Sequence, residues 1–436
     1  MNMGILLLLV AWIFEITFAI YCISTKQNHK KIKNWMRIAL FIAFILLTVS
    51  SVIEWSFRWI MLAILLFLLA ITGTVSLILN KTTIKPYKTS KIVWKSIMMI
   101  LTFVLALSPV IIFPQHPSLK VTGEYAVATA TGTYIDKNRI EEFTDKEDNR
   151  FVNVEFWYPK NADGAYPLLV FSHGAYGIKT SNESTYTELA SHGYVVVSID
   201  HPYHSFYTRS EDGTVATISS DFRHEFEENM NKGVYSNEKR YNLIQKWMKL
   251  RTDDMNFVID TILKKSKNDN NSLYQHIDTE KIGVFGHSMG GAASVRLGRE
   301  RNDISAVVNI DAPFFSELVY KKEMDDFVAS SKDFTTSLLN IYSDDVWGQL
   351  ENNSIYIANK PNNKHFKDAY TTHLKGAKHL SLTDLPLFSP ILANILQGGK
   401  ADIDQSYCIE TVNDLILKFF DFKLKGIGHF TPKETY

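Results

Sequence analysis

Residues 282–291, IGVFGHSMGG, form the stretch that decides the fold. A short apolar run leads into a turn with Ser288 at its tip, and the small residues 292–294 follow. This order is typical of a buried strand, a sharp turn and a helix, with the serine hydroxyl projecting into a cleft. Gly286 and Gly290 flank the turn because the strand and the helix approach too closely there for larger side chains. The stretch therefore predicts a nucleophilic serine.

Two backbone N–H groups are expected to face this serine. One belongs to Met289, the first residue of the predicted helix, directly after the turn formed by His287 and Ser288. The other belongs to Ala175, which follows an apolar strand at 167–171 and the sequence SHG. Two fixed donors of this kind stabilise the negative charge that develops on a tetrahedral intermediate. The sequence thus predicts an oxyanion hole built from Ala175 and Met289.

An acid and a histidine should complete a catalytic triad, and in such a site they follow the serine at the ends of later strands. Asp311 follows the first apolar strand after the serine, and Asp344 with Asp345 follows the next one. Chain position alone slightly favours the later pair. His379 lies in a late loop before a terminal helix and is the predicted base, whereas His373 falls within a predicted strand.

Strand and helix patterns alternate from about residue 120 onward. Residues 193–200, GYVVVSID, are largely β-branched, as expected for a strand buried on both faces of a parallel sheet. A helix is predicted at 251–265, before the strand that carries the serine. The pattern predicts an α/β-hydrolase fold, a mostly parallel sheet with helices on both faces. His201 either lines the site or supports its loops, and it is assigned no catalytic role.

A series of short motifs extends this pattern over about residues 120–420. The motifs are TGEYAV at 122–127, FWYP at 156–159, FSHG at 171–174, ASHGYV at 190–195, GHSMGG at 286–291 and HLSLTD at 379–384. In this ordered series the catalytic half resembles the platelet-activating-factor acetylhydrolase group, serine esterases of the α/β-hydrolase fold that are related to dienelactone-hydrolase-like proteins. In that family the acid follows the strand directly after the nucleophile in an apolar-Asp-Ala context, which NIDA at 309–312 matches. The resemblance therefore favours Asp311 over Asp344 and Asp345.

The resemblance implies hydrolysis of the short or oxidised acyl ester of a phospholipid, or of another small ester, with no metal and no cofactor. Ser288 would attack the ester carbonyl, His379 would move the proton, and Asp311 would orient the imidazole. The chain departs from the family in the long, charged and aromatic segment 205–241, which is predicted to form a cap or lid. Substrate preference is therefore the part of the resemblance that transfers least.

Residues 1–114 contain almost every long apolar run of the chain. Because about 17 to 25 apolar residues span a bilayer as a helix, four membrane-spanning helices are predicted. They are Met3–Cys22, Ile38–Ile53, Trp59–Leu79 and Ser96–Pro114, and the second is the shortest. A cleaved signal peptide is disfavoured for the first run because no basic residue precedes it and three further spans follow. The predicted organisation is a transmembrane domain at 1–114 and a catalytic domain at 115–436.

Lysine and arginine set the predicted orientation, because loops rich in these residues stay in the cytoplasm. The cations follow the first and the third predicted spans: Lys26, Lys30, Lys31, Lys33 and Arg37, then Lys81, Lys85, Lys88, Lys91 and Lys95. Both loops are then cytoplasmic, the N-terminus lies outside, and an even number of spans returns the chain outside at Pro114. The catalytic domain is predicted to be extracytoplasmic, on a multi-pass protein of the cell membrane.

Composition limits the classes of partner. Lysine plus arginine and aspartate plus glutamate both number 46, so no basic field favours nucleic acid. Cys22 and Cys408 lie in a predicted span and in a late helix, which argues against a disulfide, and no ligand spacing indicates a metal site. Glu15 is the one acid deep inside an apolar span, and its sequence context is compatible with a functional or a structural role. The oligomeric state is left open.

Three functions fit these patterns. The leading one is a membrane-anchored serine esterase that acts on lipid or lipid-like esters. An acyltransferase would form the same acyl-enzyme and pass the acyl group to an alcohol other than water. A membrane sensor whose hydrolase-like domain only binds a ligand is the third function, and the complete set of Ser288, Asp311 and His379 disfavours it.

Overall fold

The computed structural model describes residues 3–79, 88–116, 119–161, 163–231, 233–269 and 271–436. The chain divides into two compact units. The helical unit contains the residues up to Ser118 together with Leu387–Ile395, and the sheet unit contains Leu119–Pro386 and Leu396–Tyr436.

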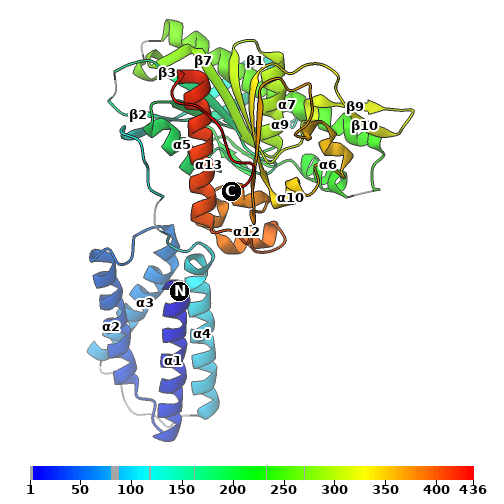
Figure 1. Ribbon diagram of the computed structural model, residues 1–436. Helices are drawn as coiled ribbons and strands as arrows, with labels where there is room; N and C mark the ends of the chain where they lie inside the picture. Colours follow the sequence, from blue (N-terminus) through cyan, green and yellow to red (C-terminus); the bar gives the residue numbers. More distant parts are fainter. Residues whose placement is uncertain (1–2, 80–87, 117–118, 162, 232, 270) are drawn as a thin grey trace. The chain divides into compact units, whose positions relative to one another are not determined.

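Four long helices make up most of the helical unit (Figure 1). They are α1 (Met3–Ser24), α2 (Lys30–Val49), α3 (Ile60–Ile78) and α4 (Thr89–Ile112), with a short 3-10 turn, η1 (Phe57–Trp59), before α3. All four are long and apolar enough to cross a membrane. Helix α2 begins at Lys30 rather than Ile38, and α4 begins at Thr89 rather than Ser96, because the apolar stems of lysine and arginine can cover the end of an apolar helix. Lys33 and Arg37 therefore lie within α2 rather than in a loop.

A buried ion pair joins α1 to α2. Glu15 in α1 is 3 % exposed, and its Oε2 lies 3.0 Å from Nζ of Lys33. Together with Arg37, the pair lines a cavity of about 200 Å³ between the helices, and the other residues around this cavity are apolar. Glu15 thus has a cationic partner within the helices, which the sequence pattern did not reveal.

A segment distant in sequence completes the helical unit. It contains the end of α11 (Leu385–Phe388) and most of α12 (Pro390–Leu396). Phe388 packs against Phe113 with ring centroids 5.0 Å apart, and the Ser389 hydroxyl donates to the carbonyl of Ile112 at 2.6 Å. The chain therefore leaves the sheet unit after Pro386 and returns to it at Leu396.

An eight-stranded sheet is the centre of the sheet unit. Its strand order is β1-β2-β4-β3-β7-β8-β11-β12. The strands are β1 (Val127–Ile140), β2 (Asn149–Pro159), β3 (Tyr166–Ser172), β4 (Val195–Asp200), β7 (Ile277–His287), β8 (Ile304–Ile310), β11 (Ser337–Ser343) and β12 (Ala369–Leu374). Strands β1 and β2 pair antiparallel with their neighbours, and all pairs from β4 to β12 are parallel. The carboxyl ends of these parallel strands therefore meet at one edge.

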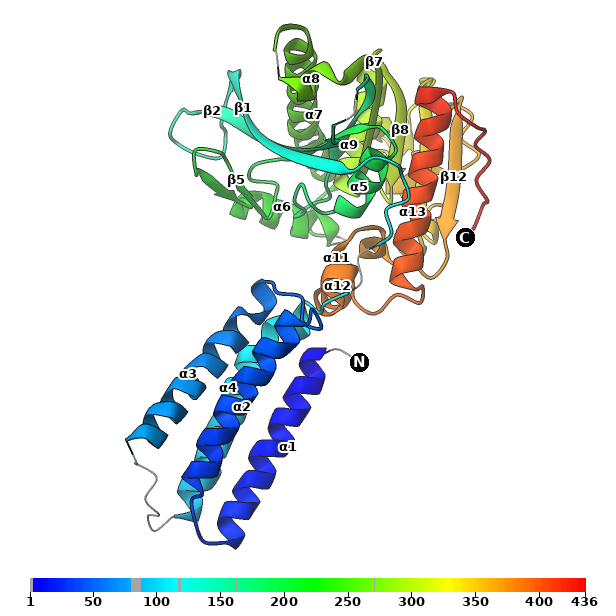
Figure 2. The same ribbon diagram turned by 90° about the vertical axis from the view of Figure 1, so that its left-hand side faces the viewer.

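Helices cover both faces of this sheet (Figures 1 and 2). Alternate strand residues face opposite cores, so that Val170 and Val284 lie in one hydrophobic cluster while Phe171 and Phe285 lie in the other. Helices α7 (Asn237–Asn268) and α9 (Met289–Glu300) bury side chains in the first cluster, and α5 (Glu183–Ser191) and α13 (Gln405–Phe420) in the second. The shorter elements are α8 (Ser272–Gln275), α10 (Asp344–Trp347), η2 (Phe315–Glu317), η3 (Ser354–Asn359), η4 (His379–Leu382), η5 (Asp421–Lys425) and a hairpin of β9 (Leu318–Lys321) and β10 (Asp326–Ala329). This is the layered arrangement predicted from the sequence.

Apart from residue 232, the segment 205–241 contains a hairpin, a helix and the first residues of α7. Strand β5 (Tyr207–Arg209) pairs with β6 (Val215–Thr217), and α6 (Ser220–Met230) follows. Phe222 and Phe226 of α6 pack on Tyr176, with ring centroids 5.9 and 5.3 Å apart. The segment therefore lies against the loop after β3, next to Ala175.

Candidate active site

Ser288 sits on a strained turn between β7 and α9. Its backbone has φ 53° and ψ −126°, a region that residues with a side chain rarely adopt. The turn is held because the Ser288 N–H donates to the carbonyl of Ile310 at 2.8 Å. A Cβ on Gly290 would lie 1.9 Å from the carbonyl oxygen of Ser172, and one on Gly286 would lie 2.3 Å from the carbonyl carbon of Gly290. The close approach of β7, α9 and the end of β3 thus requires glycine at both positions.

Asp311 and His379 form a hydrogen-bonded pair at the carboxyl ends of β8 and β12. The Oδ2 atom of Asp311 lies 2.7 Å from Nδ1 of His379. The backbone N–H and the hydroxyl of Ser343 also donate to this carboxylate, both at 2.7 Å. Asp311 is buried, whereas 34 % of the His379 side chain is exposed. An ionised Asp311 fixes the proton of His379 on Nδ1 and leaves Nε2 as a proton acceptor.

His379 lies beside the turn of Ser288. Its ring stacks on His287 with centroids 4.5 Å apart, and Nε2 of His287 donates to the carbonyl of His379 at 3.0 Å. Burial lowers the pKa of His287 well below its usual value, so this ring is neutral. Within the part of the chain that the structure describes, the Ser288 hydroxyl and His379 share no hydrogen bond. Such contacts commonly tighten only when a substrate is bound.

The alternative acids have other partners. Asp344 lies 2.6 Å from Nε2 of His373 and accepts the N–H of Gly376 at 2.8 Å. Asp345 accepts the backbone N–H of His379 at 2.9 Å. Neither carboxylate hydrogen bonds to the ring of His379. His373 itself lies in β12, as the sequence predicted for a strand residue.

The two expected oxyanion donors belong to the first residue of α9 and to the loop after β3. Met289 is the first residue of α9, so its N–H has no acceptor within the helix. Ala175 lies in the loop after β3, and none of the described residues accepts a hydrogen bond from its N–H. The adjoining Gly174 touches the turn, because a Cβ there would lie 3.2 Å from Cβ of Ser288. An unpaired N–H at this position suits an oxygen that becomes negative during reaction.

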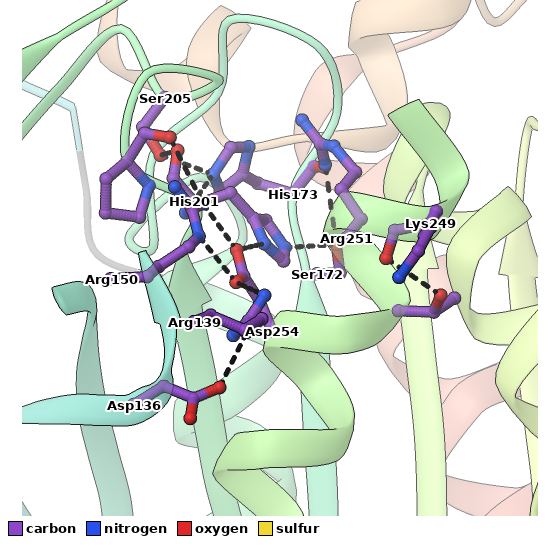
Figure 3. Close-up of polar contacts among 12 residues, drawn as sticks. Asp136, Arg139, Arg150, Ser172, His173, His201, Ser205, Lys249, Arg251 and Asp254 are labelled. Carbon is purple, nitrogen blue, oxygen red and sulfur yellow. Dashed lines mark hydrogen bonds and ion pairs between the residues drawn. The ribbon is translucent and has the colours of Figure 1, made fainter. Parts of the chain in front are cut away.

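A buried polar network joins Ser172, at the end of β3, to His201 and Asp254 (Figure 3). Nε2 of His201 lies 2.9 Å from the Ser172 hydroxyl, and Nδ1 lies 3.0 Å from Oδ2 of Asp254. Arg150 donates to both oxygens of Asp254, at 2.8 and 2.7 Å. Burial lowers the pKa of His201 to about 4, and the Arg150 guanidinium helps to hold the pKa of Asp254 well below its usual value despite burial. His201 is therefore neutral and supports the loop, one of the two roles left open by the sequence.

The sequence pattern did not identify Arg251 as part of this network. It appeared only as the start of a helix, whereas its guanidinium points toward the same loop (Figure 3). A basic residue at a buried helix position was the available signal, since an unpaired arginine is almost never fully buried. Among the described residues no group of three or more metal-ligating side chains occurs.

A mostly parallel sheet that presents a strained serine at the end of a central strand defines the α/β-hydrolase fold, and the chain is a protein of this class. Residues 149–427 match the family described as platelet-activating factor acetylhydrolase, isoform II, and the chain belongs to that family.

Curated relatives agree with this assignment. The chain is 25 % identical to the platelet-activating factor acetylhydrolase of Canis lupus familiaris over 279 residues, which cover 60 % of this chain and 58 % of the relative. It is 26 % identical over 276 residues to that of Gallus gallus, covering 58 % and 61 % of the two chains. A probable 1-alkyl-2-acetylglycerophosphocholine esterase of Arthroderma benhamiae is 26 % identical over 153 residues, covering 35 % of this chain and 33 % of that one. The chain thus spans about three fifths of the length of the vertebrate relatives.

A solved structure shares the fold. The ferulic acid esterase from Streptomyces cinnamoneus superposes with a TM-score of 0.54 and 18 % sequence identity, covering 72 % of this chain and 95 % of that chain. At this identity the likeness concerns the fold alone, and it confirms the predicted α/β-hydrolase architecture.

Proposed function

We propose that the chain is a membrane-anchored serine esterase that hydrolyses short acyl esters of the phospholipid type. The observation that carries this proposal is the pair of Asp311 and His379, 2.7 Å apart, beside the strained Ser288. Family membership supports ester hydrolysis. The names of the relatives, which include an acetylglycerophosphocholine esterase, support a short acyl group on a glycerophospholipid.

The reaction would proceed through an acyl-enzyme. His379 Nε2 takes the proton of Ser288 as its oxygen attacks the ester carbonyl, and the C=O π electrons move onto the carbonyl oxygen. The N–H groups of Ala175 and Met289 stabilise that negative charge. The intermediate then collapses, the ester C–O bond breaks, and His379 gives its proton to the leaving alcohol. Water then attacks the acyl-enzyme in the same way and releases the carboxylic acid. Asp311 stabilises the His379 imidazolium during both acylation and deacylation.

The remaining parts of the chain would govern access. Four helices long enough to cross a bilayer would keep the enzyme at the membrane that supplies its lipid. The segment 205–241, whose helix α6 packs on Tyr176, would act as a cap next to the oxyanion loop. The acyl length that the cap admits would set the preference among esters.

A labelling experiment tests the proposal. The detergent-solubilised full chain is incubated with a fluorophosphonate probe and with p-nitrophenyl esters of increasing acyl length, beside Ser288→Ala and the control Ser305→Ala, whose serine is exposed on β8. We expect labelling and short-chain hydrolysis in the wild type and in the control, and neither in Ser288→Ala. Absence of labelling in folded wild-type protein would overturn the proposal and favour a ligand-binding role.

A further inference from the structure

Arg251 is a buried cation without an ion pair. It lies in α7 and is 0 % exposed, and no carboxylate of the described residues forms a salt bridge with it. Burial lowers its pKa to about 9, so the guanidinium stays charged at neutral pH. A buried charge that lacks an ionic partner is costly. The guanidinium must therefore be stabilised by neutral polar groups.

The guanidinium binds the backbone of the loop that carries Ala175. Nη1 donates to the carbonyl of His173, which Figure 3 shows beside Arg251, and Nη2 donates to the carbonyl of Gly174 at 3.2 Å. The Gly174 carbonyl also accepts from Nδ1 of His173 at 2.6 Å and from the N–H of Gly177 at 3.1 Å. This oxygen is thus fixed from several sides, and one of its donors carries a full charge.

The hydrogen bonds to the Gly174 carbonyl also fix the direction of the Ala175 N–H, because of the geometry of the peptide group. The Gly174 carbonyl and the Ala175 N–H belong to one planar trans peptide, in which C=O and N–H point in opposite directions. Holding the carbonyl toward Arg251 therefore turns the N–H away from the buried network. Hydrogen bonds to the carbonyl also polarise the amide and strengthen its N–H as a donor. We propose that Arg251 is a positioning residue that aims and polarises the Ala175 N–H for the oxyanion, an inference that rests on the proposed esterase function.

The network behind Arg251 fixes its position. The Ser172 hydroxyl, 3.4 Å from Nη1 of Arg251, donates to Nε2 of His201, because Nδ1 of His201 carries the proton that it donates to Asp254. Ser172, His201 and Asp254 have the composition of a catalytic triad, yet Ser172 and His201 are both 0 % exposed. No substrate can reach this serine. Its role is to support the loop and the guanidinium.

Variants of Arg251 test the inference in the full chain. Arg251→Met removes the charge and both carbonyl contacts, and Arg251→Lys keeps a charge that cannot reach both oxygens. The matched control is Arg301→Met, because Arg301 is a partly buried arginine whose ion pairs with Asp260 and Asp303 lie outside this network. We expect kcat to fall about 10²- to 10³-fold in Arg251→Met, as for the loss of one oxyanion donor, with KM changed less than about threefold. The kcat of Arg251→Lys should fall between those of Arg251→Met and the wild type, and the kcat of Arg301→Met should match the wild type.

A trifluoromethyl ketone separates this role from a general loss of structure. Ser288 adds to its carbonyl carbon, and the carbonyl oxygen becomes an oxyanion that the two N–H groups bind. Its inhibition constant should rise in parallel with the loss of kcat, while binding of the matching ether, which forms no oxyanion, should stay constant. A folded Arg251→Met or Arg251→Lys enzyme with wild-type kcat and inhibition constant would overturn the inference.

An experimental structure of Arg251→Met, or of Arg251→Lys if the first does not fold, gives a readout independent of activity. We expect the Gly174–Ala175 peptide to rotate away from its wild-type orientation in either variant. An unchanged peptide would refute the positioning role, even if the wild type proved to be an esterase. Absence of fluorophosphonate labelling in the wild type would instead refute the proposed function, and the orientation of the peptide would still decide whether Arg251 sets the loop.

Discussion

Backbone strain coincides with two of the residues proposed to carry the chemistry. Ser288 has φ 53° and Asp311 has φ 58°, although neither is a glycine. Such conformations cost about 1 to 3 kcal/mol each and persist only where neighbours over-determine them. Here the N–H of Ser288 bonds to Ile310 and that of Asp311 bonds to Ile341, at 2.8 and 2.9 Å. The sheet therefore holds both side chains in place before any ligand arrives.

The choice among the candidate acids can be tested at single residues. Asp311→Asn keeps the size of the side chain but removes the acceptor that fixes the His379 tautomer, so we expect kcat to fall roughly 10⁴-fold. Asp345→Asn is the matched control, because its amide oxygen can still accept the backbone N–H of His379. Steady-state kinetics on a short p-nitrophenyl ester measures kcat for both variants. A larger loss of kcat in Asp345→Asn than in Asp311→Asn would make Asp345 the acid of the triad.

At the scale of elements, the packing of α9 against the end of β3 leaves no room at Gly290. An added Cβ would overlap the Ser172 carbonyl oxygen at 1.9 Å, and that oxygen belongs to backbone that cannot move freely. We expect Gly290→Ala to lower the free energy of unfolding by about 3 kcal/mol or more. In Gly348→Ala the added Cβ would make an ordinary contact of 3.4 Å with the carbonyl oxygen of Asp344, so the free energy of unfolding should change little. Urea unfolding of the two variants in detergent gives the comparison, and equal stability would contradict the packing argument.

A partly buried carboxylate links the loop after η4 to the start of α5. Asp384 accepts the N–H of Ser184 at 2.8 Å, and burial raises its pKa to about 6 despite this bond. A pKa raised in the folded state favours folding below the unfolded value, and this contribution is lost as pH rises through about 6. Asp384→Asn has no such proton, so relative to the wild type its stability should improve by on the order of 3 kcal/mol between pH 4 and pH 7.5. Unfolding curves across this range measure the difference, and a difference independent of pH would contradict the assigned cause.

The sequence predicted elements whose signals are local and missed features that depend on distant contacts. The elbow at 282–291 and the position of His379 follow from spacing along the chain, and the structure places both at one edge of the sheet. The start of α2 was misplaced because the charges that interrupt an apolar run do not end the helix. The role of Arg251 could not be predicted, since its partners lie more than seventy residues away in the chain.

At the scale of the whole molecule, the proposed orientation has a direct test. Cations cluster around the start of α2 and before α4, which favours a cytoplasmic location for both regions and an extracytoplasmic sheet unit. Ser305→Cys places a thiol on an exposed position of the sheet unit, and Lys88→Cys places one before α4. A membrane-impermeant maleimide should label the first in intact cells and the second only after permeabilisation. Cys22 and Cys408 are buried, and the chain that carries only these two cysteines gives the background level of maleimide labelling. The reverse pattern would place the sheet unit in the cytoplasm.

The segment Leu387–Ile395 means that the two units are not separable modules. It lies between two stretches of the sheet unit, yet Phe388 and Ser389 contact Phe113 and Ile112 near the end of α4. A chain shortened to Leu119–Tyr436 would therefore expose the apolar surface around Phe388, because its packing partners near the end of α4 would be missing. We expect it to self-associate in size-exclusion chromatography and Phe388→Ser to reduce this, whereas a monodisperse shortened chain would argue otherwise. Anyone wishing to handle the sheet unit on its own would thus have to redesign its surface around Phe388 rather than simply cut away the four long helices.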